Sequence, residues 1–421
     1  MRGLNSITVS LSVRVNGRDE TLDVQAHHTL LDVLRDQLHL TGSKECCACG
    51  ECVLTAPGAP KVIEGGRYGA SFLAHLVVAK CADSIPIYRI EKDFKRQGVP
   101  VSRSTMNELF HRAADILSPL SALLLEQIRH RFLVLADETS LRMLDDGNGK
   151  PKTGFVWTFQ APDENGVADV SYVFAKGRSS ETPRKVLTGT SGVLLVDGYS
   201  GYNSVDEVST RVRAACHAHA RRYFHEALPT SPIASEAIDF IVELYRVEHD
   251  AKTLNVIGTE QHLAMRQERS KPVREQFEAW LAKQLSLHPP RSPLGVAIRY
   301  TQGQWTELGR FLDDARIPLD NNASERALRR VALGRKNFLF VRDIESGENI
   351  AGLYSLIATC EARGINPFAY LADVLTRVQE HPHKRLDELL PAAWAAARFE
   401  AVTAGSIAKF SSTPELKAYL L

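Results

Sequence analysis

The first 40 residues alternate between apolar and polar positions and then change to a helical spacing. Residues 7–25, ITVSLSVRVNGRDETLDVQ, show a period of two on both sides of an Asn-Gly pair. Such a pair between two alternating runs is a strong hairpin signal. In residues 28–40, HTLLDVLRDQLHL, the leucines recur at helical spacing. We therefore expect a hairpin and then a helix, the opening half of a β-grasp.

Residues 67–130 have a helical pattern throughout. Within them, residues 89–117 divide into a helix, a turn around Gly98, and a second helix. Arg96 and Arg103 lie near this turn. A helix-turn-helix of this kind can enter the major groove of DNA. An ordinary helical pair is the alternative, and the pattern alone leaves both open.

From residue 131 the pattern changes to strands separated by helices. Strand-like runs occupy residues 131–140, 153–160, 169–175, 191–202 and the start of 210–224. Three strands, a helix, a strand, a helix and a further strand predict a mixed sheet with helices on it, an α/β fold. Residues 232–315 are mostly helical, so we expect them to form an insertion into that unit.

Composition narrows the class of protein. A chain of 421 residues is expected to hold two or three domains, and 44% hydrophobic with 24% charged residues is typical of a soluble globular protein. The net charge of +1 provides no global positive field, so a nucleic-acid partner would have to bind local patches. Because no apolar run is long enough for a membrane span and the first residues lack a signal core, we expect a cytoplasmic protein without a membrane partner.

Two of the predicted strands end in an aspartate, Asp137 and Asp197. Side chains at strand ends of α/β sheets point into a shared crevice. A third acid, Glu325, stands at the head of a basic stretch in residues 318–337, PLDNNASERALRRVALGRKN. Three carboxylates from two strands and a helix can hold two Mg²⁺ or Mn²⁺ ions. Such a pair activates a water or a 3′-hydroxyl and stabilises the leaving oxygen in phosphoryl transfer.

Each acid also has an ordinary structural explanation. Asp197 with Gly198 is a common turn pair, and Asp137 could be a surface acid. With Asn322 as the N-cap of the next helix, Glu325 would fall at N3 and complete a capping box. Capping and metal binding compete for one carboxylate, so we expect Glu325 to do one of the two.

Four motifs occur in the order VLADETS, LLVDGYSGYN, CHAHARRYF and DNNASERALRRVALGRKN. With them, about residues 46–395 resemble the insertion-sequence-66 family of transposases. The resemblance implies a ribonuclease-H-like mixed sheet with a helical insertion, an acid triad with two metal ions, and cutting and joining of double-stranded DNA at terminal inverted repeats. Carried over by motif, the catalytic and magnesium-binding triad is Asp137, Asp197 and Glu325.

The same motifs contain supporting residues. Cys216 and His219 fit a Cys-x-x-His signature of several transposase families, which is either a zinc-binding pair or a strand-end pair that orders the active site. The family usually has Trp at the position of His217 and often His at that of Leu135; neither change touches the triad. The helix start and the DNA backbone near the metals are the expected roles of Asp320, Asn321 and Asn322.

Basic residues near these motifs are expected to contact DNA phosphates, which position a duplex and dominate affinity. They are Arg103, Arg221, Arg222, Arg326, Arg329, Arg330, Arg335 and Lys336.

Four of the seven cysteines crowd into CCACGEC. Cys46-x-x-Cys49 is half of the family's zinc ribbon, and Cys49-x-x-Cys52 is a competing register. A structural zinc site needs four ligands, so a closed site is not expected. About residues 7–45 resemble the ferredoxin-like iron–sulfur small subunit of molybdenum hydroxylases. The similarity stops before a set of four cluster ligands, so a two-iron cluster is not expected.

The expected organisation therefore combines two sources. It has a truncated β-grasp fragment at 1–45, a zinc-ribbon remnant and linker at 46–66, a helical DNA-binding region at 67–130, a catalytic core at 131–365, and C-terminal helices at 366–421.

We expect a bacterial, nucleoid-associated transposase that acts as a homo-oligomer with accessory proteins of the same element. Loss of the family's own N-terminus predicts impaired activity. The alternatives are an inactive DNA-binding remnant, a nuclease without joining activity, and an iron–sulfur electron-transfer protein.

Overall fold

The computed structural model describes residues 8–15, 18–25, 33, 62–63, 66–144 and 151–403. The chain separates into two compact units, residues 1–59 and 60–421. In the first unit, β1 (Thr8–Val15) and β2 (Arg18–Gln25) pair antiparallel along their whole length, so the predicted hairpin is confirmed. Apart from Val33, the predicted helix at 28–40 lies outside the described residues, as does the cysteine cluster at 46–52.

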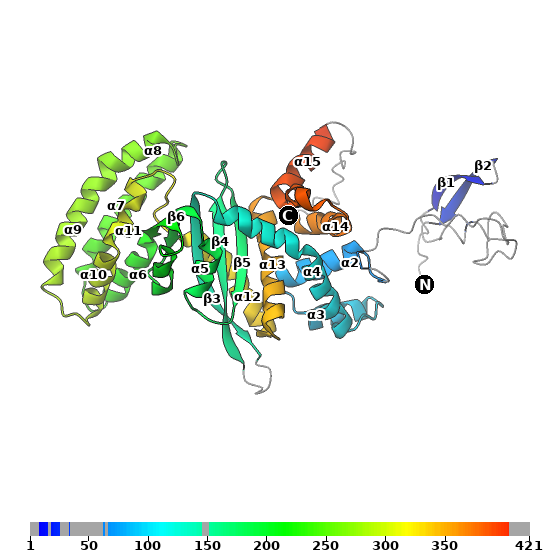
Figure 1. The fold of residues 1–421 in the computed structure, drawn as a ribbon, viewed down its shortest axis with the longest axis horizontal. Coiled ribbons are helices and arrows are strands. Elements are labelled where there is room, and N and C mark those ends of the chain that lie inside the picture. Colours follow the sequence, from blue (N-terminus) through cyan, green and yellow to red (C-terminus); the bar gives the residue numbers. More distant parts are fainter. Residues whose placement is uncertain are drawn as a thin grey trace, which may run out of the picture. The chain divides into compact units, whose positions relative to one another are not determined.

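The second unit is built around a mixed sheet (Figure 1). Its strands are β3 (Leu133–Met143), β4 (Lys152–Pro162), β5 (Ala168–Ala175), β6 (Ser191–Val196), β7 (Thr210–Ala215) and the short β8 (Phe340–Val341). The order is β5-β4-β3-β6-β7, with β8 paired to β3. The first three strands are antiparallel, whereas β6 and β7 run parallel to β3. The predicted mixed α/β sheet is thus confirmed, and its strand order is consistent with a ribonuclease-H-like core.

Helices precede, interrupt and follow the sheet. Before it come α2 (Ala70–Cys81), α3 (Ile87–Arg96) and α4 (Arg103–Arg129). Within it lie α5 (Glu181–Leu187) and the 3-10 helix η2 (Ser200–Val205). After β7 follow α6 (His217–Ala227), α7 (Ala234–Thr253), α8 (Glu260–Met265), the π-helix η3 (Arg266–Ser270), α9 (Lys271–Leu285), α10 (Pro293–Gly303), α11 (Trp305–Gly309) and η4 (Arg310–Leu312). The chain continues with α12 (Asn322–Phe338), α13 (Ile344–Ala362), α14 (Pro367–Arg377), η5 (His383–Leu389) and α15 (Pro391–Thr403).

Figure 1 shows α7 to α11 gathered into one helical body beside the sheet. This insertion occupies the chain between β7 and α12. None of the helices that the structure describes combines the length and the apolar character that crossing a bilayer requires.

The predicted helical pair near residue 100 is present as α3 and α4. Gly98 lies between them with a φ of +79°, a conformation that suits glycine. Ser102 caps α4 by accepting a hydrogen bond from the Thr105 N–H at 3.2 Å. α4 then packs along the sheet and against α13. Most of the charged residues of α3 are exposed.

The two faces of the sheet have different covers. On β3, Val134 and Ala136 belong to the large core that α4 and α13 complete. Leu133 and Leu135 point the other way, into a smaller core completed by residues of the insertion and of the segment before α12. Because side chains alternate along a strand, Asp137 lies on the face of Leu133 and Leu135.

The start of α12 is bonded to the sheet by a docking segment, residues 319–324. Within it, the fully buried Asn321 donates from Nδ2 to the carbonyl of Ala136 at 2.8 Å. Its Oδ1 accepts from Ser324 Oγ at 2.7 Å, and Ser324 Oγ accepts from Gln160 Nε2 at 2.9 Å. A chain of buried hydrogen bonds therefore connects β3, the docking segment and β4.

The capping box, the alternative explanation for Glu325, does not form. Helix α12 begins at Asn322 with Asn321 in the N-cap position, and no side chain caps it. The Asn321 Oδ1, which would have to accept a backbone N–H to cap the helix, accepts from the Ser324 hydroxyl instead, while Nδ2 is bonded to Ala136. Asp320 instead accepts from the Asn322 N–H at 3.0 Å, and the Glu325 carboxylate has partners outside α12.

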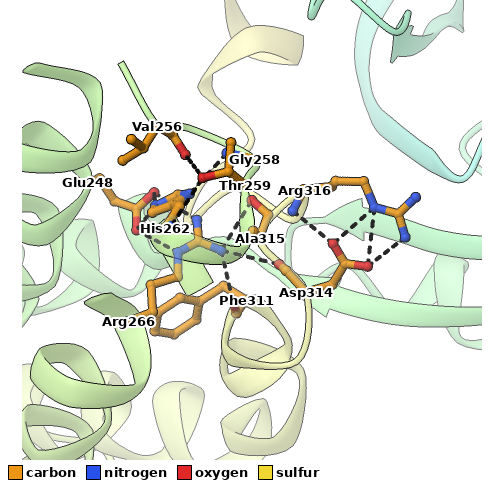
Figure 2. A network of polar contacts seen from close by, with 10 residues as sticks. All are labelled: Glu248, Val256, Gly258, Thr259, His262, Arg266, Phe311, Asp314, Ala315 and Arg316. Carbon is orange, nitrogen blue, oxygen red and sulfur yellow. Dashed lines mark hydrogen bonds and ion pairs between the residues drawn. The ribbon is translucent and has the colours of Figure 1, made fainter. Parts of the chain in front are cut away.

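The insertion is joined to the loop that leads into the docking segment (Figure 2). Arg266, with 1% of its surface exposed, donates to both carboxylate oxygens of Glu248 at 2.8 and 2.7 Å. Its Nη1 donates to the carbonyls of Phe311, Asp314 and Ala315 at 2.8, 3.2 and 3.4 Å. One paired guanidinium thus satisfies three buried carbonyls and holds the approach to α12.

Replacing Asn321 by Ala should destabilise the core, because it leaves buried partners without hydrogen bonds. We expect the free energy of unfolding to fall by about 2–4 kcal/mol, at about 1–3 kcal/mol for each group left unpaired. Urea unfolding followed by tryptophan fluorescence measures this. Asn322→Ala is the matched control: it keeps the backbone N–H that bonds to Asp320, and we expect a change within about 0.5 kcal/mol. Equal effects of the two substitutions would contradict the docking role of Asn321.

Candidate active site

The register of the sheet brings two of the predicted acids together. Strands β3 and β6 are parallel neighbours in which Leu135 pairs with Leu195. Asp137 lies two residues further along β3, and Asp197 directly follows the last residue of β6, so the two acids lie at the same end of adjacent strands. Helix α12 adds Glu325 from its first turn. Two strands and one helix therefore direct three carboxylates to one end of the sheet.

Asp137 has a strongly perturbed carboxyl group. Its Oδ1 accepts the Glu138 N–H at 2.8 Å. The pKa of Asp137 is raised to about 7, mainly by burial and in addition by the charges of Glu138, Asp197 and Glu325, against the lowering effect of that hydrogen bond. Negative charges that repel one another in a buried site would be relieved by a cation.

Glu325 is paired with two side chains of α6. Its Oε1 lies 2.9 Å from Arg222 Nη2 and 3.5 Å from His219 Nε2. Burial lowers the pKa of His219. Across the described ranges, no three side chains of His, Cys, Asp or Glu are gathered closely enough to hold a metal ion. The charges of Asp197 and Glu325 act on Asp137, but the Glu325 carboxylate is paired with Arg222 and His219.

The donor chemistry nevertheless fits a hard divalent cation. Carboxylate oxygens are the ligands that Mg²⁺ prefers, and it keeps several waters, so few protein ligands suffice. Asp137 and Asp197 would hold the ion from the strands, and Glu325 would complete the set from α12. The raised pKa of Asp137 is the observation that favours this assignment.

The acid next to Asp137 was not predicted as part of the site. Glu138 points to the opposite face because of the strand's alternation. Its side chain is 1% exposed, lies 2.5 Å from Arg178 Nη2, and accepts from the Tyr202 hydroxyl at 2.7 Å. Burial raises the pKa of Glu138, and Tyr202 and Arg178 lower it. Glu138 is a buried, paired acid that raises the pKa of Asp137 without facing the crevice.

The insertion contributes a wall that the sequence did not indicate. A Cβ atom on Gly198 would collide with the side chains of Gln304 and Tyr300, so these residues lie directly against the turn after β6. Tyr300 packs on Tyr223 with ring centroids 4.3 Å apart. Burial raises the pKa of Tyr300 to about 12, and the charge of Asp197 adds to this rise.

Cys216 and His219 have different partners. The buried Cys216 thiol accepts the Asn321 N–H at 3.2 Å, and burial raises its pKa to about 11. His219 faces Glu325 instead. Between them, His217 is buried with Nδ1 3.1 Å from the Leu319 carbonyl. The Cys216 thiol therefore helps to fix the docking segment, which favours the ordering role over the zinc-binding pair.

The basic residues predicted to contact DNA form two groups. Those with exposed side chains are Arg103, Arg221, Arg222, Arg326, Arg329 and Lys336. The other two are bonded within the fold. Arg330 donates to the Cys81 carbonyl at 2.7 Å and pairs with Glu361. Arg335 donates to the Ser140 carbonyl on β3 at 2.8 Å. Cys46 and Cys49 lie outside the described residues.

Comparisons with known proteins identify the family of the chain. Residues 65–349 match the family described as "Transposase IS66 family", and residues 355–392 match "IS66 C-terminal element". The chain is 36% identical over 379 residues to "Uncharacterized protein y4jD" of Sinorhizobium fredii, covering 86% of this chain and 73% of that protein. It is 33% identical over 370 residues to "Uncharacterized protein y4hP" of the same organism, covering 83% and 66%.

A second, short similarity concerns a different class of protein. Over 57 residues the chain is 46% identical to "Aldehyde oxidoreductase iron-sulfur-binding subunit PaoA" of Escherichia coli (strain K12), 14% of this chain and 23% of that subunit. Both predicted resemblances are therefore confirmed. Since the transposase match covers well over half of the sequence, the chain belongs to the IS66 family of DDE transposases.

Proposed function

We propose that this protein cuts and joins DNA at terminal inverted repeats, with Asp137, Asp197 and Glu325 as its acid triad. The family implies phosphoryl transfer on DNA and the use of a divalent metal. The observation that supports the assignment to these residues is that Asp137 on β3 and Asp197, directly after β6, lie at the same end of paired strands, with Glu325 within electrostatic reach of Asp137.

The reaction has two phosphoryl transfers. In the first, a water oxygen attacks the phosphorus and the bond to the 3′-oxygen breaks, which releases a 3′-hydroxyl. In the second, that hydroxyl attacks a phosphodiester of the target strand and displaces another 3′-oxygen. Two bound divalent ions would activate the attacking oxygen and stabilise the leaving one. Asp137 has to lose its proton to serve as a ligand, and the wall of Tyr300 and Gln304 would limit access of water from the insertion side.

DNA contacts are proposed for the exposed basic residues. On α12, Arg326, Arg329 and Lys336 are spaced by three and seven positions, so they share one helical face that begins next to Glu325. Arg222 on α6 adds to this basic surface beside Glu325, whereas Arg221, the preceding residue, acts on Tyr245 and is not part of it. Phosphate contacts there would fix the duplex relative to the acids. Joining two transposon ends needs two such sites, so we propose a homo-oligomer.

A second candidate function is a DNA-binding protein without catalysis. The pairing of Glu325 with Arg222 favours it, because the ion pair occupies Oε1 of the third acid and reduces its negative charge towards a metal ion.

Labelled DNA carrying the flanking inverted repeats distinguishes the two. The full chain with Mg²⁺ should give cut and joined products, which EDTA abolishes. Glu325→Gln should lower the rate on the order of 100-fold or more, because even outer-sphere changes at metal sites cost about 10–100-fold. Glu345→Gln, an exposed glutamate in the first turn of α13, is the matched control and should cleave normally. Unaltered DNA from a folded protein that still binds the repeats would establish the second candidate.

The raised pKa of Asp137 makes a prediction about stability without metal. Its pKa is about 7 in the folded protein, against 3.8 for an unperturbed aspartate side chain, so the ionised form destabilises the fold above pH 7. This penalty disappears as the pH falls from 7 towards 4. In EDTA at pH 8, Asp137→Asn should therefore raise the free energy of unfolding by about 2–4 kcal/mol, at about 1.4 kcal/mol for each pKa unit.

The increase in the free energy of unfolding caused by Asp137→Asn should be smaller at pH 5 than at pH 8. Mg²⁺ at pH 8 should stabilise the wild type more than the variant. Urea unfolding at both pH values measures these differences. Asp239→Asn, at an exposed position on α7, is the control and should show neither trend. A gain from Asp137→Asn that is the same at pH 5 and pH 8 would be incompatible with the assigned pKa.

The proposed DNA surface predicts a change in salt dependence. Arg329→Ala should weaken DNA binding and reduce the slope of log K against log salt concentration by about 1, since one phosphate contact is lost. Arg291→Ala removes an exposed arginine from the loop before α10 and should leave the slope unchanged. Fluorescence anisotropy at several salt concentrations measures both. Identical slopes for Arg329→Ala and the wild type would remove this residue from the interface.

A further inference from the structure

One carboxylate oxygen of Glu325 has two partners. Its Oε1 lies 2.9 Å from Arg222 Nη2 and 3.5 Å from His219 Nε2, both on α6. The side chain of Arg222 is 55% exposed and that of Glu325 is 35% exposed. Both side chains are therefore partly exposed, so water, a metal ion and DNA can reach the pair.

The same carboxylate is needed for the proposed metal site. The Arg222 guanidinium occupies Oε1 of Glu325, and its positive charge opposes a cation that would bind between Asp137, Asp197 and the same carboxylate. Arg222 and the metal ions thus compete for Glu325.

We propose that Arg222 is a positioning residue with two alternative partners. Before metal ions bind, it pairs with Glu325. When they bind, it releases Glu325 and pairs with a phosphate of the bound DNA. The inference rests on the proposed function, since it takes Glu325 as the third ligand. The released guanidinium suits this second role because its planar fork matches the oxygens of a phosphate. The exchange couples completion of the metal site to DNA binding.

The strength of the ion pair is suited to an exchange. Exposed salt bridges are weak, and one of this kind changes an equilibrium by about 1.4- to 5-fold. Arg222 therefore lowers the affinity for metal without preventing binding. A fully buried pair would have locked Glu325 away from the site.

Arg221 provides a matched comparison. It is the preceding residue of α6, it is also exposed, and it carries the same charge. It acts electrostatically on Tyr245, whose hydroxyl donates to Asp320, and among the residues that the structure describes it forms no ion pair with Glu325. Substituting Arg221 therefore reports the effect of removing a nearby positive charge without breaking the bond to Glu325.

The first experiment measures metal binding without catalysis. The full chain is titrated with Mn²⁺ at pH 8 and constant ionic strength, and the concentration that gives half of the maximal thermal stabilisation is recorded. Arg222→Met should lower this midpoint about two- to fivefold. Arg221→Met should leave it within experimental error of the wild type. A midpoint that is unchanged or higher in Arg222→Met, or lowered equally in Arg221→Met, would overturn the proposal.

A double-mutant cycle tests whether Glu325 carries the effect. In a Glu325→Gln background, Arg222→Met should no longer change the Mn²⁺ midpoint. Persistence of the full shift in that background would refute the competition.

The second experiment measures the affinity for DNA at saturating Mn²⁺. Arg222→Met should bind the inverted repeats more weakly than the wild type, so that metal affinity and DNA affinity move in opposite directions. Unchanged DNA affinity would overturn the exchange. If the wild type itself shows no stabilisation by Mn²⁺ and no cleavage, the proposed function fails; if it shows both while Arg222→Met behaves as wild type, the inference alone fails.

Discussion

The arrangement of the acids depends on one buried hydrogen bond, from the Asn321 amide to the carbonyl of Ala136. The two residues are 185 positions apart, yet Ala136 immediately precedes Asp137 and Asn321 immediately precedes the helix that carries Glu325. The bond therefore sets the distance between a strand residue and a helix residue that no local interaction could relate. Arg266 supports it from the insertion, because it holds the loop that enters the docking segment (Figure 2).

Around this anchor the fold tolerates an unfavourable charge arrangement. Asp137 is buried among acids, and its raised pKa of about 7 means that ionising it costs folding free energy. Packing and hydrogen bonding elsewhere in the fold have to offset this cost. Two features limit the cost. The alternation of β3 turns Glu138 to the other face, where Arg178 and Tyr202 pair with it, and Arg222 neutralises Glu325. Arg178 and Arg222 thus neutralise part of the negative charge that a metal ion would otherwise balance.

Local periodicity was sufficient to predict most of the architecture. The hairpin, the strands from β3 to β7 and the helical insertion follow from patterns of two and of 3.6 residues, which are read within a short window. The start of α12 was predicted one residue late and with the wrong cap, because the partner of Asn321 lies on β3. Tyr300 and Gln304 were missed for the same reason: their position against Gly198 depends on how the insertion packs. Adjacency to Asp137 was the only sequence signal for Glu138.

The basic run after Glu325 shows how one helix can serve two purposes. Helical periodicity places Arg326, Arg329 and Lys336 on the exposed face of α12, whereas Arg330 and Arg335 turn inward to a carbonyl of α2 and to β3. The inward pair fixes the helix to its neighbours, so the outward set has a defined position relative to Glu325. A local surface of this kind is compatible with a net charge of only +1, because the remaining charges are distributed over other parts of the chain. The density of arginines in this stretch therefore reflects anchoring as much as the proposed DNA contact.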